Sequence, residues 1–413
     1  MTTAKTTVMA TLTEGARAEA TIDLAALRGN LDALRERIGG TTVMAAVKAD
    51  AYGHGAVRCA REAVAAGIGW LGTATPEEAL ALRAGGIRPD QARILCWLWT
   101  PGGPWHEALF ADLDISVSGR WALDELLAAV RATGLPARVH LKADTGLGRN
   151  GCQPHDWPEL VAAARRAELD GLLTVVGVWS HFAAADEPGH PSIQAQLDAF
   201  HVALAVAEAA GLRPEVRHLA NSPATLLLPQ SHFDMVRTGL AMYGLSPVPE
   251  VGSPADFGLR PVMSLTARLA LVKHVPGGHG VSYGHHYTTP GPTTLGLVPL
   301  GYGDGIPRHA SGIGPVQVEG KWRTVAGRVA MDQFVVDLGG DTPEIGDEVL
   351  VFGNGERGEP TAEDWGRACG TISYEIVTRI GARVPRRYIG SLDEGLDAGL
   401  DGLRGGLHGG LLG

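Results

Sequence analysis

Two hydrophobic patterns alternate along the first 240 or so residues of the chain. Short apolar, β-branched runs of four to seven residues are typical of buried strands. Between them lie Ala- and Leu-rich segments with apolar residues every three or four positions, which predicts helices. The predicted strands are Val43–Lys48, Gly69–Thr73, Ala92–Trp97, Leu113–Val117, Ala137–Lys142, Thr174–Ser180, Glu215–Leu219 and Asp234–Arg237.

Strands that alternate with helices indicate a parallel sheet with right-handed crossovers. Eight such units in one stretch favour a (β/α)8 barrel, the TIM barrel, over an open sheet. Asp23 is expected to cap the start of a further helix at its N-terminal end. The predicted helices include Pro76–Ala84, Arg120–Ala132, Trp157–Ala167 and Ile193–Ala210.

The pattern changes after about Pro247, where helical spacing fades and β-rich runs stand between Gly and Pro turns. We therefore expect an α/β fold: a barrel domain over residues 18–250 and a C-terminal, mainly β domain over 251–391. A flexible extension (1–17) and a disordered Gly/Leu-rich tail (392–413) flank them. The predicted β runs are Val262–Val275, Thr293–Leu300, Pro315–Val318, Thr324–Val329, Gln333–Leu338 and Asp347–Phe352, with a short helix at Pro360–Gly370.

Composition narrows the classes of function. The net charge of −10 argues against nucleic acid as a partner. No apolar run reaches 18 residues, so no membrane span or membrane partner is expected, and the N-terminus lacks the apolar core of a secretory signal. The four cysteines are widely spaced and form no metal-type or redox-type pair, so we expect free thiols, no metal and a cytoplasmic location.

Lys48 is the first candidate for chemistry because it closes a nearly all-apolar predicted strand. In a barrel the strand C-termini face the active site, and desolvation lowers the pKa of an amine, which suits a nucleophilic lysine. Position alone equally fits a lysine that reaches out to solvent. The run Lys48-Ala49-Asp50-Ala51-Tyr52-Gly53-His54-Gly55 closely resembles the cofactor-lysine motif of bacterial, pyridoxal-phosphate-dependent alanine racemases.

This resemblance extends over roughly residues 18 to 389. It implies a barrel that binds pyridoxal 5'-phosphate, with Lys48 bonded to the cofactor and Tyr52 among its contacts. It also implies a homodimer that interconverts L- and D-alanine and supplies D-alanine for peptidoglycan synthesis. The architecture it implies agrees with the strand count, which does not depend on it.

Further family motifs follow the fifth and sixth predicted strands. In the segment from Lys142 to Arg149, glycines allow a tight loop over the barrel mouth. The resemblance gives Arg149 to the cofactor's phenolic oxygen and to the substrate carboxylate, and Lys142 to a lysine that is carbamylated in many members. It gives His181 to a cofactor-site histidine, whereas Trp179 departs from the expected tyrosine.

The loops after the seventh and eighth strands commonly bind phosphate in barrels. The resemblance assigns Ser222, Gly239 and Leu240 to the cofactor phosphate and adds Asn221 to the cofactor contacts. Arg237 matches the partner of the pyridine nitrogen. A guanidinium cannot pass its proton to the ring, which favours prompt reprotonation of the α-carbon over side reactions.

The β domain supplies the remaining matches. Tyr283 lies in the motif of the second catalytic base, which reaches the cofactor of the partner subunit, and Tyr374 matches a phosphate-binding tyrosine. Met331 matches a residue whose backbone N–H contacts substrate, although Ala330 replaces the family's usual cysteine. The pair His285-His286 is a local departure that we interpret as surface.

Three alternatives remain open from the residues. A decarboxylase of the related two-domain type usually pairs the ring nitrogen with a carboxylate and uses a cysteine, against which Arg237 and Tyr283 argue. A non-enzymatic cofactor carrier is a single barrel and has no place for the β domain. A racemase of broader amino-acid specificity is the hardest to separate, because pocket breadth depends on side-chain placement.

Overall fold

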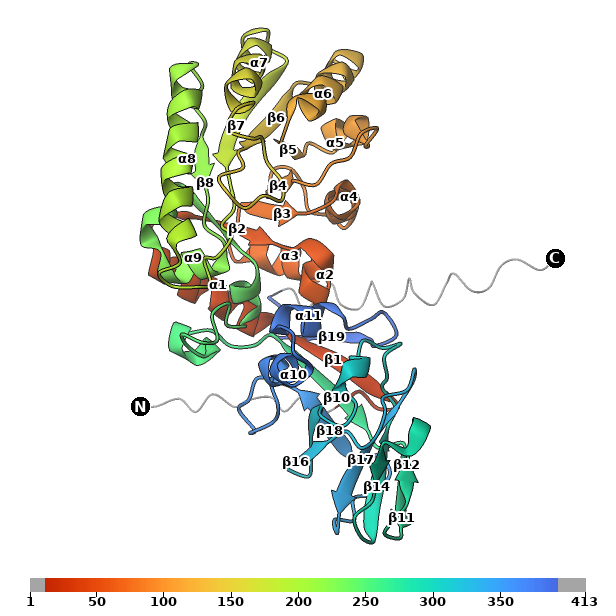
Figure 1. Ribbon diagram of the computed structural model, residues 1–413. Coiled ribbons are helices and arrows are strands. Elements are labelled where there is room, and N and C mark those ends of the chain that lie inside the picture. Colours follow the sequence, from red (N-terminus) through yellow and green to blue (C-terminus); the bar gives the residue numbers. More distant parts are fainter. Residues whose placement is uncertain (1–11, 393–413) are drawn as a thin grey trace, which may run out of the picture.

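The computed structural model describes residues 12–392, so all of the predicted tail except Leu392 and most of the predicted N-terminal extension lie outside the described residues. The chain forms a barrel domain and a β domain that stack on each other (Figure 1). The C-terminal ends of the barrel strands and helix α11 (Ser373–Thr378) bound the region of the pocket described below, and helix α10 (Ala362–Cys369) precedes α11.

The barrel contains an eight-stranded sheet whose order is β8-β7-β6-β5-β4-β3-β2-β9, all in parallel. The amide of Asp234 donates to the carbonyl of Arg217 and links β9 back to β8, so the ring is nearly closed. All eight strands predicted from the sequence are present, within one or two residues at each end. They are β2 Thr42–Ala46, β3 Trp70–Thr73, β4 Arg93–Cys96, β5 Asp114–Val117, β6 Ala137–Lys142, β7 Leu173–Trp179, β8 Val216–His218 and β9 Met235–Thr238.

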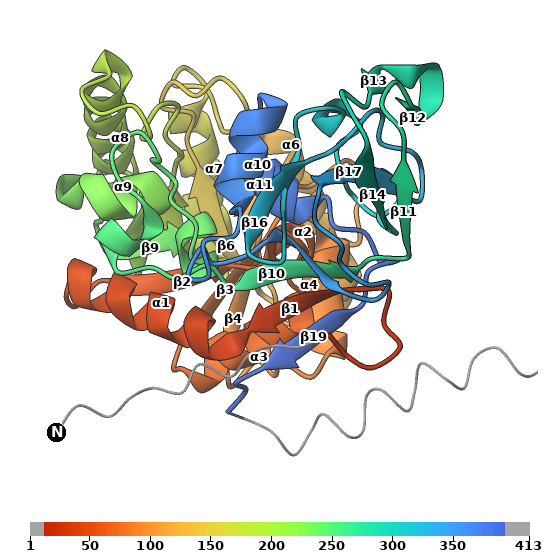
Figure 2. The ribbon, with the colours of Figure 1, turned by 90° about the horizontal axis from the view of Figure 1, so that it is seen from below.

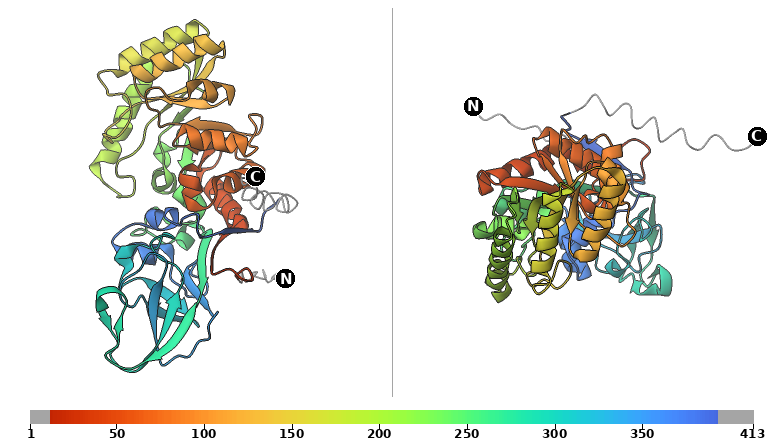
Figure 3. Two further views of the ribbon diagram at one scale, coloured as in Figure 1. Left: turned by 90° about the vertical axis from the view of Figure 1, so that its right-hand side faces the viewer. Right: turned by 90° about the horizontal axis from the view of Figure 1, so that it is seen from above.

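Helices surround these strands when the barrel is seen from above (Figure 3). The predicted cap is confirmed, because the Asp23 carboxylate accepts from the amide of Ala26 over 2.9 Å. Thr75 and Glu78 form a capping box at the start of α4. The main helices are α1 Leu24–Ile38, α3 Ala56–Ala65, α4 Pro76–Ala84, α5 Trp105–Phe110, α6 Arg120–Thr133, α7 Trp157–Leu169, α8 Pro191–Ala209 and α9 Ser222–Leu227.

The second domain is mainly β, as predicted. A six-stranded sheet has the order β16-β15-β18-β10-β1-β19, and β11-β14-β17 form a smaller one. Strand β1, at the N-terminal end of the described chain, lies between β10 and β19 in Figure 2 and pairs with both. The strands are β1 Ala18–Asp23, β10 Met263–Arg268, β11 Leu271–Val275, β12 Gly280–Val281, β13 Tyr287–Thr288, β14 Thr293–Val298, β15 Pro315–Val318, β16 Lys321–Thr324, β17 Phe334–Gly339, β18 Glu348–Phe352 and β19 Arg386–Ile389.

Two expectations for the β domain need correction. The predicted strand Thr324–Val329 is wrong beyond its first residue, because Gly327 turns the backbone at φ +77° and only an isolated bridge at Val325 follows. The run Val262–Val275 is two strands rather than one. In the described part of the predicted N-terminal extension, Arg17 forms a 2.7 Å ion pair with the buried Asp304.

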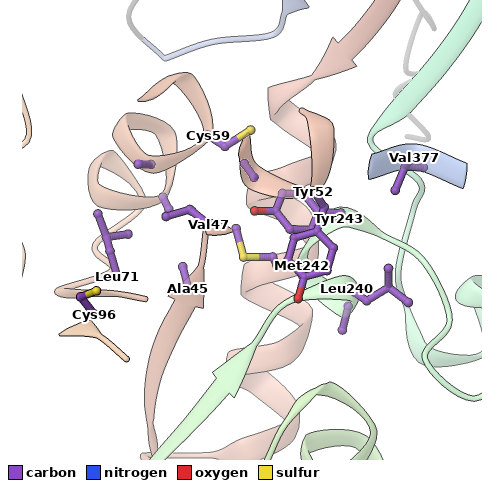
Figure 4. Close-up of a cluster of buried hydrophobic side chains, with 14 of the residues drawn as sticks. Ala45, Val47, Tyr52, Cys59, Leu71, Cys96, Leu240, Met242, Tyr243 and Val377 are labelled. Atoms are coloured by element: carbon purple, nitrogen blue, oxygen red, sulfur yellow. The ribbon is translucent and has the colours of Figure 1, made fainter. Parts of the chain in front are cut away.

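A cluster of buried hydrophobic side chains, which includes the pocket-lining Tyr52 and Leu240, lies near the end of β2 (Figure 4). The rings of Tyr52 and Tyr243 lie side by side there, with centroids 5.0 Å apart. The hydroxyl of Tyr243 donates to the carbonyl oxygen of Ala46 at the end of β2. This contact fixes the chain immediately before Lys48.

Candidate active site

A pocket of about 550 Å³ opens at the C-terminal ends of the barrel strands. This is the end of a TIM barrel at which functional groups gather, because the βα loops converge there. The pocket is lined by Ala46, Lys48, Tyr52, Ala74, Trp97, Leu98, Lys142, Arg149, Asn150, Trp179, His181, Asn221, Ser222, Pro223, Arg237, Gly239, Leu240 and Tyr374.

The pocket brings together the predicted barrel-domain residues and one from the β domain, Tyr374, which is carried by α11. Lys48 follows β2 rather than ending it as predicted, since the strand stops at Ala46. Lys142 and Arg237 belong to strands β6 and β9 themselves. The full set of predicted residues at the pocket is Lys48, Tyr52, Lys142, Arg149, His181, Asn221, Ser222, Arg237, Gly239, Leu240 and Tyr374.

The charged residues that line the pocket are all basic. Lys48, Lys142, Arg149 and Arg237 line it, and none of the described lining residues is a carboxylate. Burial and then the charge of Arg149 lower the pKa of Lys48. Burial, Arg237 and Arg149 lower the pKa of Lys142 to about 7, and burial lowers that of Arg237 to about 9. Such a cluster favours an anionic ligand, because an anion relieves the repulsion among these groups.

The segment that follows Lys48 is a left-handed turn. Residues Ala49–Tyr52 have φ between 51° and 54°, although none is glycine. L-residues in this conformation cost about 1–2 kcal/mol each, so surrounding contacts must hold them. Glu78 accepts from the first amide of the turn, Asp50 caps an amide of α3, and Arg386 donates to the carbonyl at its end. The turn places the ring of Tyr52 at the pocket wall.

Arg237 is held by two histidines. One guanidinium nitrogen donates to Nδ1 of His218 and the other to Nδ1 of His181, both over 3.1 Å. Burial and then Arg237 hold the pKa of each imidazole well below its usual range, so both rings are neutral acceptors. Sequence reasoning missed the role of His218. The signal that could have revealed it is the position of His218 on a predicted barrel strand, where an inward-facing side chain is expected to be apolar.

Trp179 stands where the family motif has a tyrosine, and its ring packs between the cationic groups. The Lys142 ammonium lies 4.2 Å and the Arg237 guanidinium 4.7 Å from the ring centroid. The ring also stacks on His218 with an interplanar angle of 6°. The indole N–H donates to Ser116, so this residue keeps a polar partner as well as cation–π contacts.

Several hydrogen-bond donors that line the pocket have no partner. The Ser222 hydroxyl oxygen accepts from the amides of Gly239 and Ala241 and ties the two loops together. Within residues 12–392, the hydroxyls of Tyr52 and Tyr374 and the guanidinium of Arg149 have no hydrogen-bond partner. Donors without partners around a cationic pocket fit the oxygens of a phosphate or a carboxylate.

Tyr283 and Met331 are not at this pocket. Both side chains are exposed, at 69% and 53%, on the β domain. Tyr283 lines a second hollow of about 420 Å³ together with Ser282, His285, Ala330 and neighbouring residues. His285 lines this hollow and His286 is exposed next to it, and no metal-binding cluster occurs in the described part of the chain. Within one chain, therefore, Tyr283 and Lys48 belong to different sites.

A barrel whose mouth carries a buried lysine, an arginine–histidine cluster and unpaired donors, joined to a β domain, defines a two-domain barrel enzyme for a small anionic ligand. The alanine racemase N-terminal domain matches residues 22–247 and the alanine racemase C-terminal domain residues 262–388. The chain belongs to the alanine racemase family.

Individual relatives agree over most of the chain. It is 73% identical to the alanine racemase of Streptomyces coelicolor, covering 90% of this chain and 96% of that protein. It is 57% identical to that of Frankia casuarinae over the same shares. The crystal structure of alanine racemase from Streptomyces lavendulae superposes with a TM-score of 0.90 at 67% identity, covering 91% of this chain and 98% of that one.

Among the described residues, no helix is long and apolar enough to cross a membrane. The cysteines Cys59, Cys96, Cys152 and Cys369 are all buried free thiols, as the sequence predicted.

Proposed function

We propose that this protein interconverts L-alanine and D-alanine with pyridoxal 5'-phosphate bound in the barrel pocket. The observation that carries the proposal is the cluster of Lys48, Arg149 and Arg237 at a pocket that no aspartate or glutamate lines. A phosphate and a substrate carboxylate are the anions that such a cluster can accommodate together. The family membership supports the same reaction.

The polar groups around the pocket fit four groups of the cofactor. Lys48 offers a partly desolvated amine for a covalent bond to its aldehyde carbon. The hydroxyls of Tyr52 and Tyr374 are unpaired and free to reach a phosphate. Ser222, Asn221 and the backbone of Gly239 and Leu240 line the same end. Arg237 would face the ring nitrogen, and Arg149 the ring oxygen.

When bound, pyridoxal phosphate draws electrons from the substrate α-carbon and makes the α-proton easier to remove. The residues of the chain determine how strongly the ring withdraws electrons and how the substrate is oriented. Arg237 keeps its protons at neutral pH, so it donates to a ring nitrogen without protonating it. Arg149 holds the substrate carboxylate and thereby fixes which face of the α-carbon meets each base.

Racemisation requires proton transfer on both faces of the α-carbon. We assign one face to the Lys48 amine and the other to the Tyr283 hydroxyl of the partner subunit in a homodimer, where Met331 would offer its backbone N–H to the substrate. The exposure of both β-domain side chains supports a role at a subunit interface. Mixing inactive Lys48→Ala protein with inactive Tyr283→Ala protein should restore activity through mixed dimers. A fully active monomer would contradict the assignment.

We propose that Lys142 is carbamylated and that the carbamate holds Arg149. The pKa of about 7 leaves much of this amine neutral at physiological pH, and the neutral amine is the form that reacts with CO2. Labelling with 13C-bicarbonate should give a carbamate signal that Lys142→Met lacks. An identical signal in both proteins would place the carbamate elsewhere.

Alanine specificity is tested most directly with a panel of L-amino acids and added cofactor, scored for loss of optical rotation. We expect alanine to react far faster than the others; comparable rates would make this a racemase of broader specificity. We also propose a cytoplasmic role in supplying D-alanine for peptidoglycan, which the buried free thiols support.

A further inference from the structure

A line of polar side chains crosses the interior of the barrel beneath the pocket. Asp114 of β5 contacts Nε2 of His140 on β6 over 3.2 Å. Nδ1 of His140 contacts Nε2 of His218 on β8 over 2.9 Å, and Nδ1 of His218 meets the Arg237 guanidinium over 3.1 Å. The carboxylate and both imidazoles are fully buried. We call these four residues the interior line.

The two ends of the line fix the direction of its hydrogen bonds. Asp114 is a carboxylate that accepts from Arg93 over 2.5 Å and from Arg138 over 2.6 Å, so it can only accept from His140 as well. Arg237, at the other end, can only donate. Two neutral imidazoles between them satisfy every contact in one way: His140 and His218 each carry a proton on Nε2 and a lone pair on Nδ1. A cationic His140 would force a proton onto Nδ1 of His218, opposite an arginine N–H.

The backbone of β7 leaves room for the two imidazoles of the interior line. A Cβ atom at Gly177 of β7 would lie 2.2 Å from Nδ1 of His140, the atom that contacts His218. The register between β6 and β7 shifts between Val139 and His140, which sets His140 opposite Gly177. Trp179 stacks on His218, and Trp70 packs edge-on against His140. Aromatic rings thus surround the imidazoles, and the missing side chain at residue 177 makes room for their contact.

We propose that Asp114 is a positioning residue for Arg237, acting through His140 and His218 to present a lone pair on His218 Nδ1 to the guanidinium. The proposal rests on the proposed function only in giving Arg237 its place at the cofactor ring. Without the carboxylate, either imidazole can reverse its tautomer and turn an N–H toward Arg237. The guanidinium would then lose an acceptor that fixes its plane beneath the pocket.

The pKa values of the two rings agree with this arrangement. Burial lowers the pKa of His140 despite its hydrogen bond to Asp114, and burial followed by Arg237 holds that of His218 well below its usual range. Burial opposes ionisation of Asp114, yet His140, Arg138 and Arg93 together lower its pKa to about 2. An ionised carboxylate and two neutral imidazoles are the charge states that the line requires.

The direct test is the protonation of the imidazole nitrogens in the unmodified protein. Long-range 1H–15N spectra of protein labelled with 15N-histidine, without added cofactor, should show His140 and His218 protonated on Nε2 only. The His140→Phe protein identifies the first signal by its loss. A proton on Nδ1 of His218, or a cationic His140, overturns the proposal. This measurement does not use racemase activity, so its result stands apart from the proposed function.

A matched pair of variants tests the role of the carboxylate. Asp114→Asn should mix the tautomers of His218 and lower kcat by about tenfold with little change in KM, the size of effect of one lost hydrogen bond. Asp112→Asn removes an ion pair with the same Arg138, 2.6 Å long, but lies outside the line. It should leave both the tautomers and kcat as they are. Equal changes in the two variants, or an unchanged His218 in Asp114→Asn, overturn the proposal.

The same question remains answerable if Asp114→Asn does not fold. His140→Phe keeps the pairs of Asp114 with Arg93 and Arg138 and removes only the middle of the line. It should leave His218 in a mixture of tautomers. A His218 that keeps its proton on Nε2 alone in this variant shows that the carboxylate does not direct it.

Discussion

A Cβ atom placed on Gly239 would lie 2.2 Å from the hydroxyl oxygen of Tyr52. The two residues come from segments that follow β9 and β2, two neighbouring strands of the parallel sheet. Glycine at residue 239 therefore leaves room for the unpaired Tyr52 hydroxyl beside a backbone amide that is bonded to Ser222. The proposed contact of both residues with the cofactor phosphate depends on this close approach.

Replacing Gly239 with alanine should weaken cofactor binding by about tenfold or more, because the added methyl group displaces the Tyr52 hydroxyl. It should also cost about 1–3 kcal/mol of stability, as overpacking does in a buried site. Titration of the cofactor-free protein, followed by absorbance, measures the affinity. Gly29→Ala is the control: this glycine lies in α1, a methyl group there would have nothing within 4 Å, and the change should leave affinity unchanged. Equal affinities for Gly239→Ala and the unmodified protein would refute the steric argument.

Lys48→Ala should abolish nearly all racemisation, since no other described lysine except Lys142 lines the pocket. Borohydride reduction of the protein with pyridoxal phosphate should attach the cofactor to the peptide that carries Lys48, as mass spectrometry can establish. Lys273→Ala changes an exposed lysine of β11 and should retain activity and labelling. Label on any other lysine contradicts the assignment.

The depressed pKa of Lys142 predicts a pH-dependent stability. The folded protein releases this proton near pH 7, whereas the unfolded chain holds it to about 10.5. The unfolded state therefore binds more protons between these values, and the free energy of unfolding should rise with pH across that window. Below about pH 7 both states are protonated and the full penalty applies.

Lys142→Met should remove this contribution and stabilise the cofactor-free protein at pH 7 by on the order of 2 kcal/mol. Urea unfolding at pH 7 and pH 9 in CO2-free buffer, at equal protein concentration, measures the difference. Lys321→Met, which changes an exposed lysine, should keep the slope of the unmodified protein. A pH slope for Lys142→Met that equals that of the unmodified protein would show that Lys142 is not the responsible group.

The local parts of the fold were predictable from the sequence. The strands of the barrel read as short apolar runs because they are buried on both sides, and helix α4 was predicted at its observed bounds because Thr75, Pro76 and Glu78 mark its start. The prediction of strand Thr324–Val329 failed because its apolar residues fill the core while only Val325 forms a bridge. The tertiary position of β1 gives no local signal, since its partners lie more than two hundred residues away.

The candidate site also contains residues that the sequence could predict and residues that it could not. Residues at strand ends, such as Lys48 and Arg237, were predictable because barrel geometry brings those ends together. The interior line was not. Asp114, His140 and His218 are separated by 26 and 78 positions and meet only when the barrel closes. Each looks like an ordinary polar residue until its neighbours across the barrel are known.

The final prediction concerns the two faces of the substrate α-carbon. One base on one face would have to move around the substrate plane to return a proton to the other, and two bases avoid that motion. We expect Lys48 to handle the α-proton of D-alanine and Tyr283 of the partner subunit that of L-alanine. In deuterated water, Tyr283→Phe should still exchange the α-proton of D-alanine slowly but scarcely that of L-alanine, as 1H NMR can follow. Tyr287→Phe is the control, because its hydroxyl is bonded to Asp337 in the same domain and should leave both exchange rates close to those of the unmodified protein. An equal loss of exchange from the two enantiomers in Tyr283→Phe would point to one shared base.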